Sequence, residues 1–381
     1  MGAVRAAGGA SLADVQAFAL GQGRALPVLP GTRHVTVGGA VAADVHGKNH
    51  ERDGSFARHV TEVTLATPDG VLRVTPDSDP DLFWATAGGL GLTGVVVEAV
   101  LRTVPAETAA ARVLSRRAAN LDEVMTALEA ARGRHRYAVA WLDARARGSA
   151  TGRGVLSWGD DATLADLPAP QRVRPLAVDA ARTMEVPAWA GGGARAGRGV
   201  AVLNDLRFRR APRTSTITVE PLDRFLFPLD AVDGWNRLYG RAGFVQYQFV
   251  VPFRAGGVVG VALERLRVAG CPPFLAVLKR LGRADPGPLS FPVPGWTLAV
   301  DFPAAMPGLA RVLDGLDELV AAEGGRVYLA KDARLRPELL AAMYPGLDRW
   351  RVTKAQVDPT GVLTSDLGRR LGLVRPLVGT G

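Results

Sequence analysis

The chain has 381 residues, of which 48% are apolar and 22% charged, and its formal net charge is +9. This length suits two domains or one large composite domain, and this composition excludes a disordered or fibrous protein. The single cysteine, Cys271, excludes internal disulfides and CxxC motifs, and we expect it to be a small buried apolar residue. No apolar run approaches the roughly 20 residues of a membrane helix, and the first residues lack the apolar core of a signal peptide.

The cations are almost all arginine. Lysine occurs only four times, at Lys48, Lys279, Lys331 and Lys354. In such a background, a lysine hints at a position that needs a compact ammonium group or an amine with an adjustable pKa. The densest basic run, RFRRAPR at 207–213, is too short for a nucleic-acid-binding tail, so we expect no nucleic acid as a partner. A loose attraction to anionic lipid or phosphate stays open.

The first hundred residues predict one helix, followed mostly by strands and glycine turns. Ser11 and Asp14 form a capping pair at the start of a helix over 11–21. Residues 60–76 alternate as a β-hairpin, and VVVEAVLRTV at 95–104 alternates as a further strand.

The remainder of the chain predicts strands interleaved with helices. Residues 159–200 are rich in Pro, Gly and Ala and carry no clear period. The expected strands lie at 137–144, 154–158, 244–252, 296–303 and 326–331. The expected helices lie at 120–133, where Asn120 and Glu123 form a capping box, and at about 306–323.

Two of these strands divide their residues between opposite faces. Alternation predicts one apolar face against a core and one polar face, which is either solvated or part of a site. The apolar sets are Val245, Tyr247, Phe249 and Val251 on one strand and Trp296, Leu298, Val300 and Phe302 on the other. The polar sets are Gln246 and Gln248 on the first strand and Thr297, Ala299 and Asp301 on the second.

Three chemical motifs fail on their context. His46 and His50 are four residues apart, but zinc ligation at that spacing usually needs a helix, and Gly47 interrupts the segment, so we expect no metal. GGLGLTG at 88–94 formally contains GxGxxG, but a β-branched strand follows it where a Rossmann site needs a helix. The sequence has no GxSxG motif and no plausible Cys–His pair for nucleophilic catalysis.

Glycines mark the stretch VLPGTRHVTVGGAVAADVHGKNH at 28–50. Gly31, Gly38, Gly39 and Gly47 lie at expected turn positions between short apolar segments. Such glycines either serve chain geometry or let backbone N–H groups reach a phosphate or a ring oxygen. The residues alone leave both interpretations open.

Long strings along the whole chain resemble one family of flavoproteins. PGTRHVTVGGAVAADVHGKNHERDGSFARHV is similar to the flavoprotein subunits of decaprenylphosphoryl-β-D-ribose 2′-epimerases, which belong to the vanillyl-alcohol-oxidase-like FAD oxidases. The resemblance continues in order through DLFWATAGGLGLTGVV, FVQYQFVVP, GWTLAVDFP and VYLAKDARLRPELL. It implies an α+β fold in which a PCMH-type FAD-binding domain, formed by both chain ends (1–108 and 325–381), carries an inserted substrate domain of antiparallel sheet plus helices (109–324).

The resemblance also implies site residues. The catalytic residues would be Lys331 and Gln248. The cofactor-binding residues would be Gly31, Thr36, Val37, Gly38, Gly39, His46, Gly47, Lys48, Asn49, Val96 and Tyr328. The substrate-binding residues would be Lys48, Trp141, Gln246, Gln248, Lys279, Thr297, Ala299, Asp301 and Lys331. Three of the four lysines thus fall on pocket positions.

The activity that the resemblance implies is an oxidation with non-covalent FAD. The 2-hydroxyl of a polyprenylphosphoryl-β-D-ribose would become a ketone, and a short-chain NAD(P)H-dependent reductase would complete the epimerisation that supplies arabinose for cell-wall arabinan. Lys331 would take up the hydroxyl proton, Gln248 would orient the sugar, and Lys48 and Lys279 would bind hydroxyl or phosphate oxygens. The prenyl tail would lie along an apolar groove at the 185–200 loop. We expect the protein in the cytoplasm, or peripherally at the membrane or cell envelope.

Several departures from the family qualify this interpretation. Family members carry a glycine-rich pyrophosphate loop, GRSYGD-like, before the position that matches residue 1, so we expect half of the FAD phosphate site to be missing. The family's active-site cysteine corresponds to Ala299, so thiol-directed covalent inhibition should fail. Thr297 replaces an asparagine and Leu226 replaces a tyrosine. Two alternatives stay open: an oxidase of another sugar or an aldonolactone, and a truncated, cofactor-free binding partner.

Overall fold

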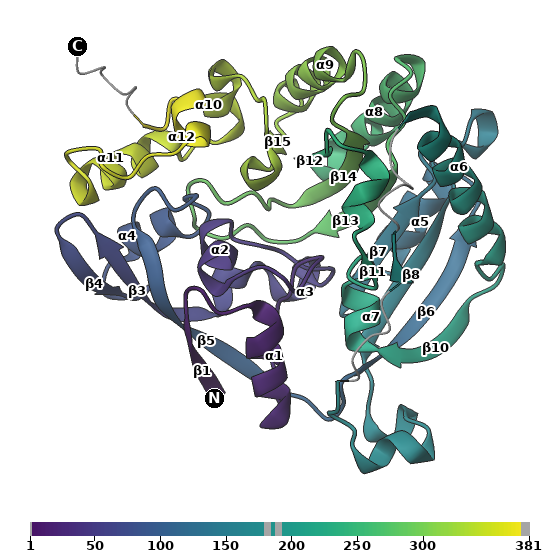
Figure 1. The fold of residues 1–381 in the computed structure, drawn as a ribbon, viewed down its shortest axis with the longest axis horizontal. Helices are drawn as coiled ribbons and strands as arrows, with labels where there is room; N and C mark the ends of the chain where they lie inside the picture. The colour runs from purple at the N-terminus through teal and green to yellow at the C-terminus, as the bar shows by residue number, and fades with distance from the viewer. Residues whose placement is uncertain (1, 179–183, 187–192, 375–381) are drawn as a thin grey trace.

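Two β-sheets form the frame of the protein in the computed structural model, which describes residues 2–178, 184–186 and 193–374 (Figure 1). The first sheet is antiparallel and is built by the amino-terminal part of the chain. Its described strands are, in order, β1 (Gly2–Ala7), β5 (Val95–Pro105), β3 (Val60–Thr67) and β4 (Gly70–Val74), with the short β2 (Arg24–Ala25) also paired to β5.

The second sheet is larger, and its strand pairs in the described part of the chain are antiparallel. Its described strands are, in order, β10 (Thr216–Pro221), β6 (Ala110–Ala118), β8 (Gly154–Asp161), β7 (Tyr137–Leu142), β13 (Leu275–Leu281), β14 (Gly295–Pro303), β12 (Phe244–Val251) and β15 (Arg326–Val327). A separate short parallel pair joins β9 (Met184–Glu185) to β11 (Val232–Asp233). Mixed helix and antiparallel sheet, the predicted fold class, is therefore confirmed at this level.

Helices pack around both sheets. In the amino-terminal part they are α1 (Leu12–Gly21), α2 (Val37–Ala42), α3 (His50–Asp53) and α4 (Pro80–Thr86). In the middle they are α5 (Leu121–Ala130), α6 (Gly193–Arg210), α7 (Leu222–Leu226), α8 (Gly257–Val268) and α9 (Leu309–Ala322), and at the end α10 (Leu340–Met343), α11 (Leu347–Val357) and α12 (Asp366–Arg370). No helix in the described part of the chain is long and apolar enough to cross a membrane.

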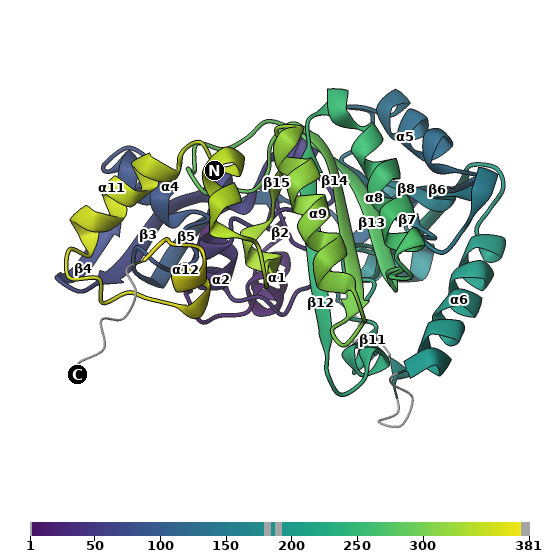
Figure 2. The ribbon, with the colours of Figure 1, turned by 90° about the horizontal axis from the view of Figure 1, so that it is seen from above.

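The apolar face of the second sheet packs against helices. Tyr247, Phe249 and Phe302 share one buried core with residues of α5, α8 and α9, which run along that side of the sheet in Figure 2. Burying apolar area against a helix layer is the main stabilising term for such a sheet. Cys271 is fully buried in the same core, as expected. The polar face is therefore turned the other way, toward the amino-terminal part of the chain.

Local signals placed several elements correctly. The Ser11 hydroxyl accepts from Asp14 N (3.1 Å) at the start of α1, and Asn120 Oδ1 accepts from Glu123 N (2.9 Å) at the start of α5. Each cap satisfies one backbone donor that the helix leaves without a partner. The hairpin predicted over 60–76 is confirmed as β3 and β4.

Three expectations were wrong. Gly38 and Gly39 lie inside helix α2 and not at turns. The strand expected over 326–331 ends at Val327, because residues 329–331 turn as a 3-10 helix. The segment 159–200, expected to lack regular structure, contains the end of β8 and the first residues of α6. Part of it, 179–183 and 187–192, lies outside the described residues.

The carboxyl-terminal helices contact the amino-terminal part of the chain. Trp350 on α11 is fully buried, and its Nε1 donates to the carbonyl oxygen of Ala85 on α4 (3.0 Å). Figures 1 and 2 both show α11 beside α4. Helix α11 thus packs against α4 at this contact.

Candidate functional site

A row of side chains crosses the polar face of the second sheet. From β12 through β14 and β13 to β7, Cα pairing aligns Gln248, Ala299, Val277 and Trp141. Residues paired across neighbouring strands project from the same face. The adjacent rows pair Gln246 with Asp301 and Thr297 with Lys279. Seven of the nine substrate-binding residues expected from sequence are therefore side by side on the sheet, with Trp141 at the β7 end of the row.

A hydrogen-bonded chain links this sheet face to the segment before α3. Gln248 Nε2 donates to Thr297 Oγ1 and to His46 Nε2, each at 3.0 Å, and Thr297 Oγ1 donates to the Phe249 carbonyl (2.8 Å). Because His46 Nε2 is the acceptor, its proton sits on Nδ1. Burial, with the charge of Lys279, holds the pKa of His46 well below its usual range, so the ring is neutral. Thr297 thus fixes the side-chain amide of Gln248, one of the two residues expected from sequence to be catalytic.

Two buried polar atoms in this region lack a partner in the described part of the chain: His46 Nδ1 and Asp301 Oδ2. Asp301 is 2% exposed, and burial raises its pKa to about 6, opposed by the charge of Lys331 and a hydrogen bond from Gln246. An unpaired buried donor or acceptor costs free energy, so such atoms mark positions that a ligand would satisfy. The site therefore offers one donor and one acceptor to a bound molecule.

Three of the four lysines surround this surface. Burial, together with the charges of Lys331 and Lys48, lowers the pKa of Lys279 to about 7. Burial also lowers the pKa of Lys48 to about 7. It lowers the pKa of Lys331 as well, against the charge of Asp301. A neutral amine can accept a proton from a hydroxyl, and an ammonium group can hold an anionic oxygen. The fourth lysine, Lys354 on α11, is paired with Asp358, which directly follows that helix.

An aromatic wall closes one side of the site. Tyr328 stacks on Phe291 with their ring centroids 4.6 Å apart, and His46 lies 5.3 and 5.5 Å from these two rings. The Tyr328 hydroxyl donates to the Ala43 carbonyl (2.8 Å), which fixes the wall to the end of α2. Sequence reasoning selected Tyr328 and His46 but missed Phe291, although it lies in a run of aromatic, proline and glycine residues that could have drawn notice.

The glycines of α2 allow a close approach between backbones. Gly38 N donates to the Gly8 carbonyl (2.8 Å), and a Cβ on Gly38 would lie 3.1 Å from that same oxygen and 3.4 Å from the Val96 carbonyl. Gly39 N donates to Thr36 Oγ1 (3.1 Å). These amides are satisfied within the chain, so the structure supports the chain-geometry interpretation for Gly38. Contacts of Gly31, Thr36, Val37, Gly39 and Val96 with a cofactor stay predictions.

The segment that contains Lys48 borders α7. Lys48 Nζ donates to the Leu226 carbonyl (2.6 Å) and lies 5.4 Å from the centre of the Phe225 ring. Asn49 Nδ2 donates to the Pro27 carbonyl (2.7 Å), and Gly47 packs so tightly on the Leu29 carbonyl that a Cβ would not fit. The expected cofactor residues Gly47 and Asn49 therefore have structural tasks in fixing this loop, and Lys48 marks its end toward α7.

His50 belongs to the frame of the site. Its Nδ1 accepts from Gly282 N (3.0 Å), and its Nε2 lies 3.2 Å from the Ser55 hydroxyl. Both ring nitrogens are thus used within the chain. Among the described residues, no group of three or more His, Cys, Asp and Glu side chains is arranged to hold a metal ion.

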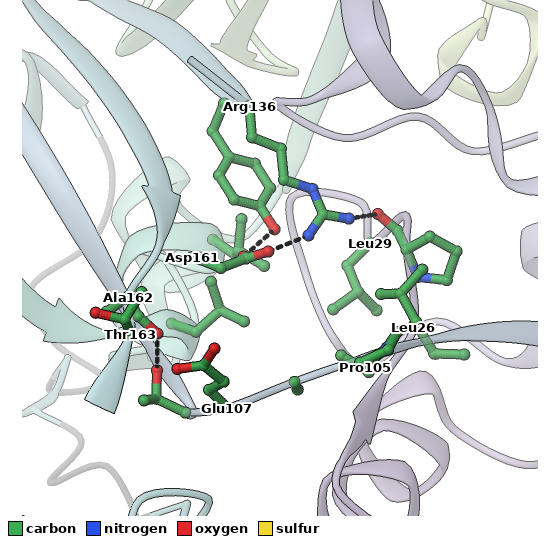
Figure 3. A pocket seen from close by; sticks show the side chains of 16 residues that line it. Leu26, Leu29, Pro105, Glu107, Arg136, Asp161, Ala162 and Thr163 are labelled. Carbon is green, nitrogen blue, oxygen red and sulfur yellow. Dashed lines mark hydrogen bonds and ion pairs between the residues drawn. The ribbon is translucent and has the colours of Figure 1, made fainter. Parts of the chain in front are cut away.

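A small cavity of about 150 Å³ lies between the end of β5 and the second sheet (Figure 3). Its polar groups bond to one another. Arg136 pairs with Asp161 and donates to the Pro27 carbonyl, and the Tyr137 hydroxyl donates to Asp161 (3.0 Å). Because these groups are already satisfied, we assign no ligand to this cavity and treat it as part of the joint between the two sheets.

The described residues fit a flat, polar cofactor between α2 and the second sheet. His46 supplies a buried donor without a partner in the described part of the chain, the Tyr328 wall supplies an apolar side, and Lys279 and Lys331 lie close enough to act on the charge of His46. Such an arrangement of apolar walls and a few convergent polar groups is typical of cofactor sites.

Comparison with known proteins agrees with this arrangement. A family described as "FAD binding domain" matches residues 1–75. Decaprenylphosphoryl-β-D-ribose oxidase of Mycolicibacterium smegmatis is 41% identical over 369 residues, 96% of this chain and 80% of its own length. A Streptomyces coelicolor protein, "Uncharacterized protein in mprA 5'region", is 46% identical over 91% of this chain and 96% of its own length. Alditol oxidase of a Streptomyces species is 35% identical over 104 residues, 27% of this chain and 24% of its own.

The fold, the site and these matches define the chain as an FAD-linked oxidoreductase of the vanillyl-alcohol-oxidase-like class, with FAD as its cofactor. Within that class, the family follows from the 41% sequence identity to the Mycolicibacterium smegmatis oxidase over 96% of this chain. The chain belongs to the decaprenylphosphoryl-β-D-ribose oxidase family, as the resemblance in sequence predicted.

Proposed function

We propose that this protein oxidises the 2-hydroxyl of a polyprenylphosphoryl-β-D-ribose to a ketone. The 41% identity over 96% of the chain to an oxidase named for such a substrate carries the proposal. When bound, FAD supplies a two-electron acceptor that takes the hydride from carbon 2 of the sugar. The proton of the 2-hydroxyl must leave in the same event, and the protein has to receive it.

Lys331 receives that proton. Burial lowers its pKa, so a larger share of the amine is neutral than for an ordinary lysine and able to accept. Asp301 next to it offers an unpartnered carboxylate oxygen that holds the resulting ammonium by charge. Gln248, fixed by Thr297 and His46, orients the sugar with the carbonyl side of its amide. Removing water from this buried face strengthens each of these interactions.

Lys279 and Lys48 bind the oxygens at the phosphate end of the substrate. Each has a pKa of about 7 without a ligand, and an anionic phosphate close by would raise that pKa and keep the ammonium form. Trp141, with the Arg207 guanidinium 4.8 Å above its ring, closes the row of residues at the β7 end. Lys279 and Lys48 thus contact the phosphate end of the substrate, and Lys331 contacts its sugar end.

The organisation of the chain follows from the same family. An FAD-binding domain formed by 1–108 and 325–381 with a substrate domain at 109–324 is supported by the bond from Trp350 to Ala85, which joins the two ends. A short-chain NAD(P)H-dependent reductase that returns the ketone to an alcohol of opposite configuration completes the epimerisation. A prenylated substrate suits an enzyme in the cytoplasm or peripherally at the membrane or cell envelope.

The test is flavin reduction in the holoprotein. Protein reconstituted with FAD and mixed anaerobically with farnesylphosphoryl-β-D-ribose should lose its visible flavin absorbance. Lys331→Ala should keep the flavin spectrum and lose the bleaching, whereas Lys354→Ala, which removes the lysine outside the site, should keep both. Bleaching of Lys331→Ala at the wild-type rate would overturn the role of Lys331, and absence of bleaching in the wild type would overturn the proposed reaction.

A second candidate is oxidation of another sugar or alditol. Leu226 stands where the family has a tyrosine, and Thr297 stands where it has an asparagine, so two polar contacts to the substrate differ. The local likeness to alditol oxidase points the same way but is limited to about a quarter of the chain (27%). A panel of free sugars, alditols and aldonolactones, each tested for flavin bleaching beside the prenylphosphoryl ribose, separates the two candidates.

A further inference from the structure

We propose that a large groove beside α7, outside the flavin site, binds the isoprenoid chain of a prenyl phosphate. The groove has a volume of about 1090 Å³. One wall is the segment around 167–178, which projects at the lower edge of Figure 1, and the other comprises α1, α7 and the start of β11. This proposal rests on the proposed function, because it assigns the tail of the same substrate.

The lining of the groove is suited to a hydrocarbon chain. Leu20, Leu167 and Phe227 line it with little exposed surface of their own, and Val173, Val178 and Val232 contribute the more exposed apolar side chains. Val173 is 80% exposed and Val178 is 43% exposed, so large apolar surface stays in contact with water when the groove holds nothing. Burying such surface against a ligand is favourable by roughly 25 cal/mol per Å². Exposed apolar surface gathered along a concavity, and not scattered singly, is the pattern that marks a ligand or partner site.

The charges around the groove are suited to an anion at one end. Arg33, Arg174 and Arg224 line it together with Asp223 and Asp230. Arg33 pairs with Asp223 (2.7 Å), and Arg224 lies 3.9 Å from Glu220, so the acids are engaged by neighbouring cations. Arg174, which forms no ion pair with an acid in the described part of the chain, is the cation that would favour an amphiphile with an anionic head over a neutral lipid.

The groove and the flavin site meet across one short segment of chain. Lys48 Nζ, on the site side, donates to the carbonyl of Leu226, and the next residue, Phe227, lines the groove. Asp230, also in the groove lining, accepts from Arg33 N (3.0 Å) and lies close enough to Lys48 to act on its charge. A phosphate held at Lys48 would therefore stand at the end of the groove, with its sugar toward Gln248 and its tail toward Phe227.

This placement differs from the position expected from sequence for the tail. The 185–200 loop was expected to cover it, but residues 187–192 of that loop lie outside the described part of the chain. The groove is formed without them, by residues of 167–178 and 221–232. Its length of apolar lining also gives the protein a means to select substrates by tail length, independent of the sugar.

The test measures the binding of prenyl phosphates without sugar. The holoprotein is titrated calorimetrically with farnesyl phosphate and with inorganic phosphate, in the wild type and in variants that fill the groove from either wall, Ala177→Trp and Ala231→Trp. Ala310→Trp, on the exposed side of α9, is the matched control. Each groove variant should weaken farnesyl phosphate binding about tenfold or more, because losing the burial of only two methylene groups is already worth that factor. Inorganic phosphate should bind all variants alike.

Several results would overturn the groove proposal. Farnesyl phosphate that binds the groove variants as tightly as the wild type would place the tail elsewhere. Equal loss in Ala310→Trp would show a general effect of tryptophan, and a concentration-dependent dimer abolished by Ala231→Trp would show that a second copy occupies the groove. These outcomes are separate from the test of the reaction. Farnesyl phosphate can bind in the groove even if the prenylphosphoryl ribose does not bleach the flavin. If the flavin bleaches but the groove variants bind farnesyl phosphate normally, the proposed reaction stands and the tail binds elsewhere.

Discussion

Replacing Thr297 with valine tests how the amide of Gln248, proposed to orient the sugar, is held. The side chain is fully buried, and its hydroxyl accepts from Gln248 Nε2 (3.0 Å) and donates to the Phe249 carbonyl (2.8 Å). Thr297→Val keeps the shape but removes both hydrogen bonds. Because Thr297 is fully buried, the variant leaves a donor and an acceptor without these bonds, and the free energy of unfolding should fall by about 2–3 kcal/mol.

The same change should slow the chemistry. Gln248 would be held by His46 alone, and a displacement of about 1 Å at a positioning group can cost about 100-fold in rate. We expect flavin reduction at saturating substrate, followed by stopped-flow absorbance, to slow roughly 10- to 100-fold. Flavin content should not change, because Thr297 is not expected to hold the cofactor.

Thr108→Val is the matched control. Thr108 is also buried, 4% exposed, and its hydroxyl donates to the Ala162 carbonyl (2.6 Å) and accepts from Ala110 N (3.3 Å). It should destabilise the protein to a similar extent in thermal unfolding and leave the rate of flavin reduction unchanged. The reasoning is refuted if Thr297→Val reduces its flavin at the wild-type rate, or if both variants slow it equally.

Three further changes have outcomes fixed by the structure. Because Lys331 has a lowered pKa and must be neutral to accept a proton, the rate of flavin reduction should rise with pH to a plateau, with the midpoint of the rise below 10.5, whereas Lys331→Ala should not bleach at any pH in this range. Gly8→Ala should lower the melting temperature of the apoprotein, because a Cβ at Gly8 would overlap a main-chain oxygen of β5. Gly9→Ala should not lower it, because the space around Gly9 is open. Equal melting temperatures of the two variants would contradict this packing. Ala299→Cys should make the protein sensitive to thiol-directed inhibitors. The wild type should stay active with the same inhibitors, because its single thiol, at Cys271, is buried. Equal inhibition of the wild type would refute this prediction.

Sequence patterns predicted the elements whose causes are local. The caps at Ser11 and Asn120 and the alternation of 244–252 and 296–303 depend on residues close together in the chain, and all of them are confirmed. Alternation also predicted which residues share the polar face. Side chains on a strand point alternately to its two faces, so once the apolar residues are buried, the residues between them must lie on the other face.

The errors arose where distant parts of the chain decide the conformation. Gly38 suggested a turn, but its missing Cβ allows α2 to approach Gly8 and Val96, contacts that no local pattern reveals. The strand expected over 326–331 stops after Val327, where its pairing with β12 ends and Tyr328 turns toward Ala43.

The candidate site was predicted as a set of residues but not as a geometry. The scarcity of lysine directed attention to Lys48, Lys279 and Lys331, and the structure brings these three together. Burial and pairing could not be predicted, because they depend on which sheet face is covered. For the same reason Phe291 and the unpartnered oxygen of Asp301 were found only in the folded protein.

The most direct test of the central claim is anaerobic flavin absorbance during addition of a prenylphosphoryl-β-D-ribose to the FAD-loaded protein, with the sugar product identified by mass spectrometry. The account predicts that the flavin bleaches in proportion to the substrate added, until the enzyme is fully reduced, and that the product is two hydrogens lighter. A flavin that stays oxidised with this substrate while bleaching with another sugar would contradict it.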